Sequence, residues 1–139
     1  MNPFNDIAIE VTDITAPVND LTDNVKAILF EINALQEGFV NNSQSGIIDL
    51  RTLPMLPGEY NMLKQILGEG EVNATLNTLG SSHIMETALT GVWWVTHDDE
   101  NNERLAEFIE VTEIPDILKS NKNETEMAYT VLKQQLESY

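Results

Sequence analysis

The spacing of hydrophobic residues changes along this chain, from a helical period in the first half to a period of two from about residue 71. In residues 71–79, Val72, Ala74 and Leu76 alternate with polar residues, which is typical of a strand with one buried and one solvated face. Further strands are predicted at residues 82–89, 91–96 and 104–112. The pattern favours one antiparallel sheet, with Val72, Ala74 and Leu76 facing the helices that cover it.

Along the sequence, helices are predicted both before and after this run of strands. Hydrophobic residues recur at three- and four-residue spacing in residues 21–37, which indicates an amphipathic helix capped by Asp20 or Thr22 and ending near Gly38. The remaining elements before the sheet are a strand at 46–53 and a helix at 58–67, which begins behind Pro57 and ends at Gly68.

The two ends of the chain complete the expected architecture. Residues 1–18 read as an arm, in which the alternation of Ile7, Ile9 and Val11 indicates a short edge strand. The C-terminal helix, at 124–138, is expected to turn four hydrophobic residues inward: Met127, Val131, Leu132 and Leu136. A length of 139 residues fits one domain. We therefore predict a single α+β domain over residues 1–139, a mostly antiparallel sheet with helices packed on one face.

The charge of the chain limits the kinds of partner it can bind. Seven basic residues against 23 acidic ones give a net charge of −16. Such a surface repels nucleic acid and anionic lipid, and it attracts basic proteins, peptides or cations. The alternative for many of these carboxylates is that they only keep the chain soluble. We expect no nucleic-acid partner.

Cysteine and long apolar segments are both absent from the sequence. Without cysteine, disulfides, thiolate metal sites and thiol nucleophiles are excluded. No stretch approaches the ~20 apolar residues that cross a bilayer. The first residues also lack the basic and apolar segments of a signal peptide. These features predict no membrane partner and a cytoplasmic location.

Residue patterns that carry catalysis are scarce. Residues 68–70, Gly-Glu-Gly, follow a predicted helix and lead into a strand, whereas a phosphate-binding loop runs from strand to helix. His83 lies beside two serines, but no Gly-x-Ser-x-Gly turn accompanies it. It is interpreted as a polar residue at a strand end. We therefore predict no catalytic residue.

Residues 97–100, His-Asp-Asp-Glu, form the densest group of metal-ligand types. One imidazole and three carboxylates suit a hard or borderline cation, and a small metal-dependent hydrolase is the hypothesis they carry. Neighbouring residues on a strand point to opposite faces, however, so adjacent ligands seldom converge. The following asparagines favour a solvated hairpin turn. We predict no metal and no cofactor.

The adjacent residues Trp93 and Trp94 are the least common feature of the predicted sheet. Alternation sends one indole to each face, and one of them is expected in the core under the helices. If the second face has no covering helix, the other indole is exposed and can anchor a partner. The alternative that both indoles are buried stays open.

Charged residues in the same strands complete a predicted partner-binding surface. Glu86 and Glu110 lie within apolar strands, where they are either an acid–base pair or residues of the solvated face. Arg51, one of only seven basic residues, is expected to pair with one of these glutamates. The predicted surface consists of Trp93, Trp94, Glu86, Glu110, Arg51 and Glu71.

Four groups of strings, taken together, resemble a known protein family. They are Ile-Asp-Leu-Arg-Thr-Leu-Pro at 48–54, Leu-Gly-Glu-Gly-Glu-Val at 67–72, Glu-Thr at 86–87 with Gly-Val-Trp-Trp-Val-Thr-His at 91–97, and Phe-Ile-Glu-Val-Thr-Glu-Ile-Pro at 108–115. Their order and spacing resemble the conserved C-terminal region of the HupH/HyaF hydrogenase expression proteins. The resemblance covers residues 46–119.

This resemblance implies an accessory role in the maturation of a nickel–iron uptake hydrogenase. The implied partner is a hydrogenase subunit precursor, with the iron–sulfur small subunit favoured, alongside other maturation factors. It implies a chaperone rather than an enzyme and supplies no catalytic residues. The chain is similar to one copy of the conserved region, whereas typical members are longer, so action as a homodimer stays open. A generic acidic adaptor for a basic partner is the remaining alternative.

Overall fold

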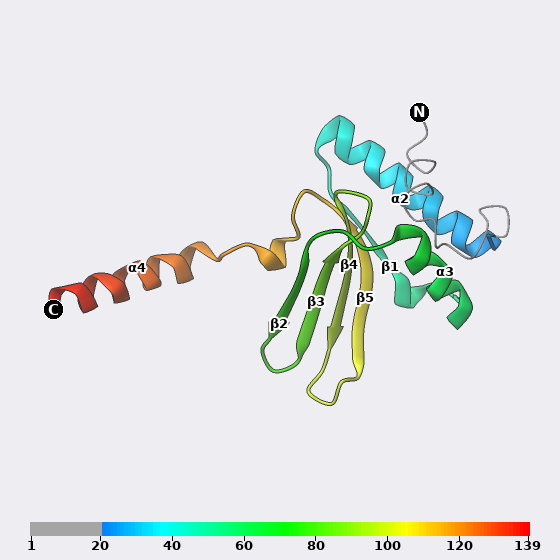
Figure 1. The fold of residues 1–139 in the computed structure, drawn as a ribbon. Helices are drawn as coiled ribbons and strands as arrows, with labels where there is room; N and C mark the ends of the chain where they lie inside the picture. The colour runs from blue at the N-terminus through cyan, green and yellow to red at the C-terminus, as the bar shows by residue number, and fades with distance from the viewer. Residues whose placement is uncertain (1–20) are drawn as a thin grey trace.

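The computed structural model describes residues 21–139, in which two helices pack on one side of a five-stranded antiparallel sheet and a third helix points away (Figure 1). The elements in chain order are α2 (Asp23–Asn42), β1 (Gly46–Asp49), the 3-10 turn η2 (Leu50–Thr52), α3 (Pro57–Leu67), β2 (Asn73–Asn77), β3 (Ser81–Glu86), β4 (Val92–Asp98), β5 (Arg104–Val111), the 3-10 turn η3 (Asp116–Leu118) and α4 (Lys122–Glu137). The α+β class and the antiparallel sheet are confirmed. The predicted strand around residues 7–11 lies outside the described residues, as does Asp20.

The order of strands in the sheet is β1-β5-β4-β3-β2, so β4 is central. The register sets Trp93 between Glu86 on β3 and Glu110 on β5. The next row sets Trp94 between two apolar partners, Met85 and Ile109. Because directly paired residues share a face and successive residues alternate, the two tryptophan rows lie on opposite faces of the sheet.

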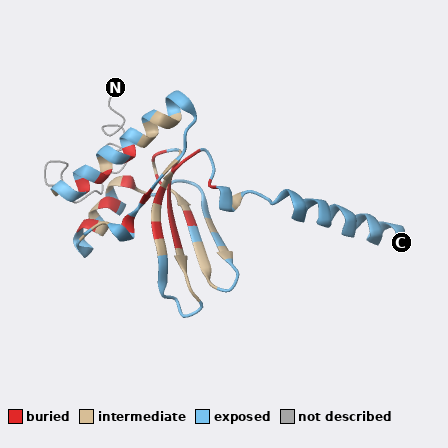
Figure 2. Cartoon of the chain, turned by 180° about the vertical axis from the view of Figure 1, so that it is seen from behind, coloured by how far each residue is buried: buried red, intermediate tan, exposed pale blue. Residues whose placement is uncertain are grey.

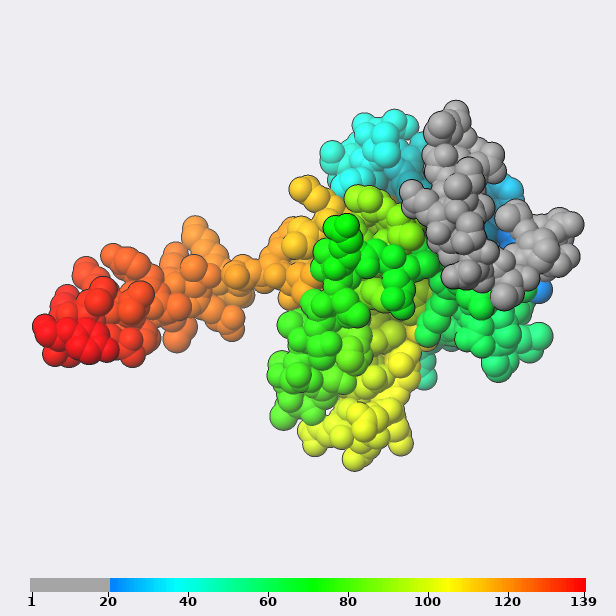
Figure 3. Space-filling model, in the orientation of Figure 1, coloured from blue at the N-terminus to red at the C-terminus, as the bar shows by residue number. Residues whose placement is uncertain are grey.

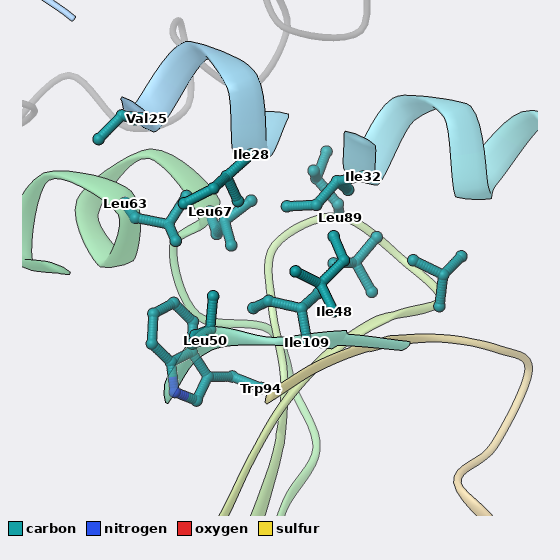
Figure 4. Packing of buried hydrophobic residues seen from close by; sticks show 12 residues of the cluster. Val25, Ile28, Ile32, Ile48, Leu50, Leu63, Leu67, Leu89, Trp94 and Ile109 are labelled. Carbon is teal, nitrogen blue, oxygen red and sulfur yellow. The ribbon is translucent and has the colours of Figure 1, made fainter. Parts of the chain in front are cut away.

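Helices α2 and α3 bury their apolar sides against the face that carries Trp94. Figure 4 shows these side chains pointing toward one another from the helices and the strands. The buried cluster consists of Val25, Ile28, Ile32, Ile48, Leu50, Leu63, Leu67, Leu89, Val92, Trp94, Ile109 and Val111. Burying each such side chain contributes roughly 1.5–3 kcal/mol, so this layer is the main source of stability.

Local signals explain where α2 begins and where it ends. The Thr22 hydroxyl caps the helix by accepting a hydrogen bond from the Val25 N–H at 3.3 Å, as the sequence predicts. The predicted end near Gly38 is wrong, because the helix continues to Asn42 and ends at Ser43, which has a left-handed φ of 54°. The extra turn lets Phe39 pack against the core, which offsets the weak helix propensity of glycine.

Glu59 connects the two core helices through its carboxylate. It accepts hydrogen bonds from the Thr22 hydroxyl, from the Leu56 N–H at 3.0 Å and from the Asn24 amide at 3.3 Å. These donors, the Thr22 hydroxyl foremost, lower the pKa of Glu59 below its ordinary value. Pro57 occupies the first position of α3, as predicted, and Gly68, at a φ of 66°, ends the helix.

The predicted direction of the β2 side chains is wrong. Ala74 and Leu76 pack on the face opposite the helices, where they contact the cluster around Ile84. The edge strand β2 is four places from β1 in the sheet order, whereas the contacts of α2 are with β1, β5 and α3. The second face therefore has an apolar cluster of its own, which a simple inside–outside pattern does not reveal.

The predicted packing of α4 is also wrong, because none of its residues is buried. Figure 2 shows the helix separated from the sheet and coloured as exposed along its whole length. Extended backbone at Lys119 (φ −82°, ψ 139°) and Asn121 (φ −74°, ψ 130°) directs the chain away from the domain. Within residues 21–139, no helix is both long enough and hydrophobic enough to span a bilayer.

Candidate partner-binding surface

The sheet face opposite α2 and α3, called here the open face, carries a second apolar cluster. Its buried members are Ile84, Trp93 and Val95, and the partly buried side chains packed on them are Ala74, Leu76, Phe108 and Leu118. Figure 1 shows both core helices on the other side of the sheet. Half-buried apolar side chains on a face that the helices within residues 21–139 leave uncovered are available to a partner.

Trp93 forms the floor of the open face and is only 4% exposed. Its indole N–H donates to the Thr112 carbonyl at 3.1 Å, and Leu118 packs against the same cluster. The segment that follows β5 therefore folds back on this indole. The expectation of an exposed tryptophan is wrong for Trp93, and the alternative that both indoles are buried is the one found.

Trp94 lies on the face of the sheet that α2 and α3 cover, and it is likewise 4% exposed. Its indole N–H donates to the Glu107 carboxylate at 2.8 Å, and Arg104 pairs with the same carboxylate at 3.1 Å. The Lys64 ammonium lies 5.2 Å from the ring centroid, which is a cation–π distance. Trp94 thus holds the helix-covered face together and has no access to the open face.

The two glutamates in register with Trp93 lie in different environments. The Glu86 carboxylate accepts from the Gly91 N–H at 3.1 Å and so braces the turn between β3 and β4. Burial raises the pKa of Glu110 above its ordinary value, and the negative charge of Asp116 adds to this effect. Lys119 opposes the rise but does not cancel it. The open face therefore carries a partly desolvated carboxylate next to its apolar floor.

Arg51 and Glu71 lie at the two edges of the sheet. The expected ion pair of Arg51 with a glutamate is wrong within residues 21–139, because its guanidinium donates to the Arg104 carbonyl at 2.6 Å. Arg51 borders an open hollow of about 410 Å³ beside β1 and β5, where Ile47 and Phe108 form apolar walls. Glu71 is exposed just before β2. Of the six predicted residues, Glu86, Trp93 and Glu110 therefore form one row across the open face. Arg51 and Glu71 lie at the edges of the sheet, and Trp94 lies on the helix-covered face.

The loop after β4 is a hairpin turn, as the sequence favours. The Asp99 carboxylate accepts from the Asn101 N–H at 2.8 Å and from the Glu103 N–H at 2.9 Å. Asp98 pairs with Arg104 at 2.6 Å, which uses a second carboxylate of the segment. Across the described part of the chain, no group of three or more histidine, aspartate or glutamate side chains is arranged to hold a metal ion.

The sequence patterns do not predict the pairing of Arg104 with Asp98 and Glu107. Alternation along β5 does place Glu107 on the same face as Ile109 and Trp94, and this is the sequence signal for its contact with Trp94. The β-bulge between His97 and Asp98 shifts the register at this point. It brings Arg104 opposite Asp98, and period-two alternation cannot anticipate such a shift.

We expect Glu110→Gln to stabilise the protein at neutral pH. The raised pKa means that the folded state binds this proton more tightly than the unfolded state does. Stability contributed by the protonated form is therefore present below the ordinary pKa of 4.5 and is lost as the pH rises through the folded-state pKa. The neutral amide avoids that loss, so the increase in melting temperature should appear at pH 7 and vanish near pH 4.

Thermal denaturation between pH 4 and pH 8 checks this expectation, with Glu113→Gln as the control. Glu113 is exposed and close in sequence, so its substitution removes the same charge without relieving burial. An equal gain in both variants would mean that only the net charge matters, contrary to the environment described for Glu110.

Three kinds of comparison relate the chain to known proteins. The family model described as "HupH hydrogenase expression protein, C-terminal conserved region" matches residues 22–139. The hydrogenase expression/formation protein HoxQ of Azotobacter vinelandii is 36% identical over 76 residues, which cover 55% of this chain and 26% of that protein. HupQ of Azotobacter chroococcum mcd 1 is 32% identical over 106 residues, covering 74% and 37% of the two chains.

A relative that aligns over more of this chain and a solved structure both agree with this match. HupH of Rhodobacter capsulatus is 25% identical over 122 residues, covering 88% of this chain and 44% of that protein. The chain spans less than half the length of these curated relatives. The structure of hydrogenase expression protein HupH from Thiobacillus denitrificans ATCC 25259 matches with a TM-score of 0.81 and 32% identity, covering 85% and 98% of the two chains. The chain therefore belongs to the HupH hydrogenase expression protein family, through its C-terminal conserved region.

Proposed function

We propose that this chain is an accessory protein in the maturation of a nickel–iron uptake hydrogenase, and that it binds a subunit precursor without catalysing a reaction. The relatives are named hydrogenase expression or formation proteins, and the matched region includes the whole sheet. Of the hydrogenase subunits, the iron–sulfur small subunit is the favoured client. Its cysteines must stay free for clusters, and a cysteine-free holder forms no mixed disulfide with them.

The observation that carries this proposal is the open face itself. Phe108 and Leu76 lie half-buried over a floor of Ile84, Trp93 and Val95, with no core helix on that side. A client segment that covers these side chains removes further apolar area from water, at about 25 cal/mol per Å². The rigid sheet pays little ordering entropy when it binds, which favours a holding role.

Charge sets the kind of segment that fits this surface. Glu86 and Glu110 flank the apolar floor, and Glu71 extends the acidic rim to the β2 edge. A basic or neutral client segment is attracted by these carboxylates, whereas an acidic one is repelled. Arg51 adds one positive charge at the β1 edge, next to the hollow, and so favours one orientation of the client.

A paired substitution tests this surface. Ile47→Lys places a charge on the open face, at a side chain that is 58% exposed and lies opposite Glu110 in the register of β1 and β5. Leu79→Lys makes the same chemical change at a residue that is 82% exposed in the turn between β2 and β3. We expect Ile47→Lys to reduce capture of the subunit precursor about tenfold or more, and Leu79→Lys to leave it unchanged.

The measurement is affinity capture by the tagged chain from cells that express the hydrogenase, quantified by mass spectrometry of the subunit precursors. Equal capture by both variants would remove the open face as the binding site. Capture of the large-subunit precursor alone would keep the accessory role but contradict the choice of client. Capture of unrelated basic proteins in place of either precursor would favour the generic adaptor.

A further inference from the structure

Helix α4 has a hydrophobic side that nothing in residues 21–139 covers. Figure 3 shows it standing clear of the rest of the molecule. Its 16 residues include none that is buried, and Leu132 is 56% exposed. Isolated helices of about this length are marginal in water, because protein helices gain most of their stability by packing an apolar side. The side chains of α4 therefore indicate a contact with another surface.

The spacing along α4 fits a second helix. Tyr129, Leu132 and Leu136 follow one another at intervals of three and four residues, which is the spacing of a helix-pair seam, and the polar Thr125 lies four residues earlier on the same stripe. Met127 and Val131 lie off this stripe. A surface hollow lies along the same stripe, bounded by Tyr129, Leu132 and Leu136 and edged by Lys133 and Glu137. A side chain from a facing helix can enter such a hollow as a knob enters a hole.

The charged residues beside this seam form opposite-charge pairs when two copies of the helix run antiparallel. Glu126 and Lys133 are seven residues apart on the same flank of the helix. In an antiparallel pair centred near residue 130, Glu126 of one copy meets Lys133 of the other, and the same pair forms again by symmetry.

The charge balance of the whole chain also favours a contact through α4. The helix holds two lysines and three glutamates, so its net charge is −1, whereas the chain carries −16. Two copies that meet elsewhere bring their acidic surfaces together, but α4 keeps those surfaces apart. We propose that α4 binds α4 of a second copy in an antiparallel pair, leaving both open faces accessible.

This contact is small, so the dimer should be weak. One helix on each side buries less than the roughly 800 Å² per partner of a standard interface. We expect a dissociation constant on the order of 1–100 μM. Sedimentation equilibrium of the full chain should therefore show a shift from one chain to two as the concentration rises through this range.

Two neighbouring substitutions separate the seam from the polar side. Leu132→Glu should give a monomer at every concentration, whereas Thr130→Glu adds the same charge on the opposite side and should still dimerise. Neither residue touches the buried cores, so the thermal transition of the sheet should be unchanged in both. That transition shows that any loss of dimer is not loss of folding.

A charge exchange tests the antiparallel register. Glu126→Lys alone and Lys133→Glu alone should each weaken the dimer, because each places like charges opposite each other. The double variant Glu126→Lys/Lys133→Glu restores opposite charges and should recover the parent dissociation constant. A parent chain that stays monomeric to several hundred micromolar, equal behaviour of Leu132→Glu and Thr130→Glu, or no recovery in the double variant would each overturn the proposal.

Discussion

Trp94→Ala is expected to lower the free energy of unfolding by roughly 3–5 kcal/mol, the usual cost of removing a large aromatic from a core. The indole belongs to the buried cluster beneath α2 and α3, and its removal also takes the N–H donor from the buried Glu107 carboxylate. Because domains of this size are stable by about 5–15 kcal/mol, the variant should be partly unfolded at 37 °C. Urea denaturation followed by circular dichroism measures the loss.

Trp94→Phe is the matched control, because it keeps an aromatic ring but loses the hydrogen bond to Glu107. It should lie between the parent and Trp94→Ala. A loss below about 1 kcal/mol for Trp94→Ala would contradict the position of this indole in the core, since that is the scale of a surface substitution.

Trp93→Ala is expected to be similarly destabilising, about 3–5 kcal/mol, although Trp93 lies on the face without core helices. The side chain anchors the segment after β5 through the Thr112 carbonyl and through contact with Leu118. Besides the loss in urea denaturation, we expect faster proteolytic cleavage within residues 112–118. A variant with the melting temperature and cleavage rate of the parent would show that this indole is a surface group after all.

The sequence predicts much of this fold because its strongest patterns are local. The period-two strands, the helix at Pro57 and the Thr22 cap depend on residues close to one another, and each is confirmed. The face to which Ala74 and Leu76 point depends instead on which strands the helices cover. This is a long-range relation that the periodicity of the sequence does not encode. The sequence therefore predicts the antiparallel sheet correctly but assigns the β2 side chains Ala74 and Leu76 to the wrong face.

The same contrast between local patterns and long-range contacts applies to the candidate surface. Alternation is enough to put Glu86, Trp93 and Glu110 on one face, because all three lie in regular antiparallel strands. It cannot reveal that the chain returns after β5 to cover Trp93. For α4, the amphipathic pattern predicts an inward-facing side, but the helix is exposed throughout, and the pattern carries no information on whether a covering surface would belong to the same molecule.

Isothermal titration calorimetry of the purified chain with purified hydrogenase subunit precursors is the decisive test of subunit binding. We expect saturable binding of the iron–sulfur small-subunit precursor with a dissociation constant on the order of micromolar or tighter. We also expect an association constant that falls with added salt, because the rim of the open face is acidic. Absence of binding to either subunit precursor at tens of micromolar protein would contradict the proposed function.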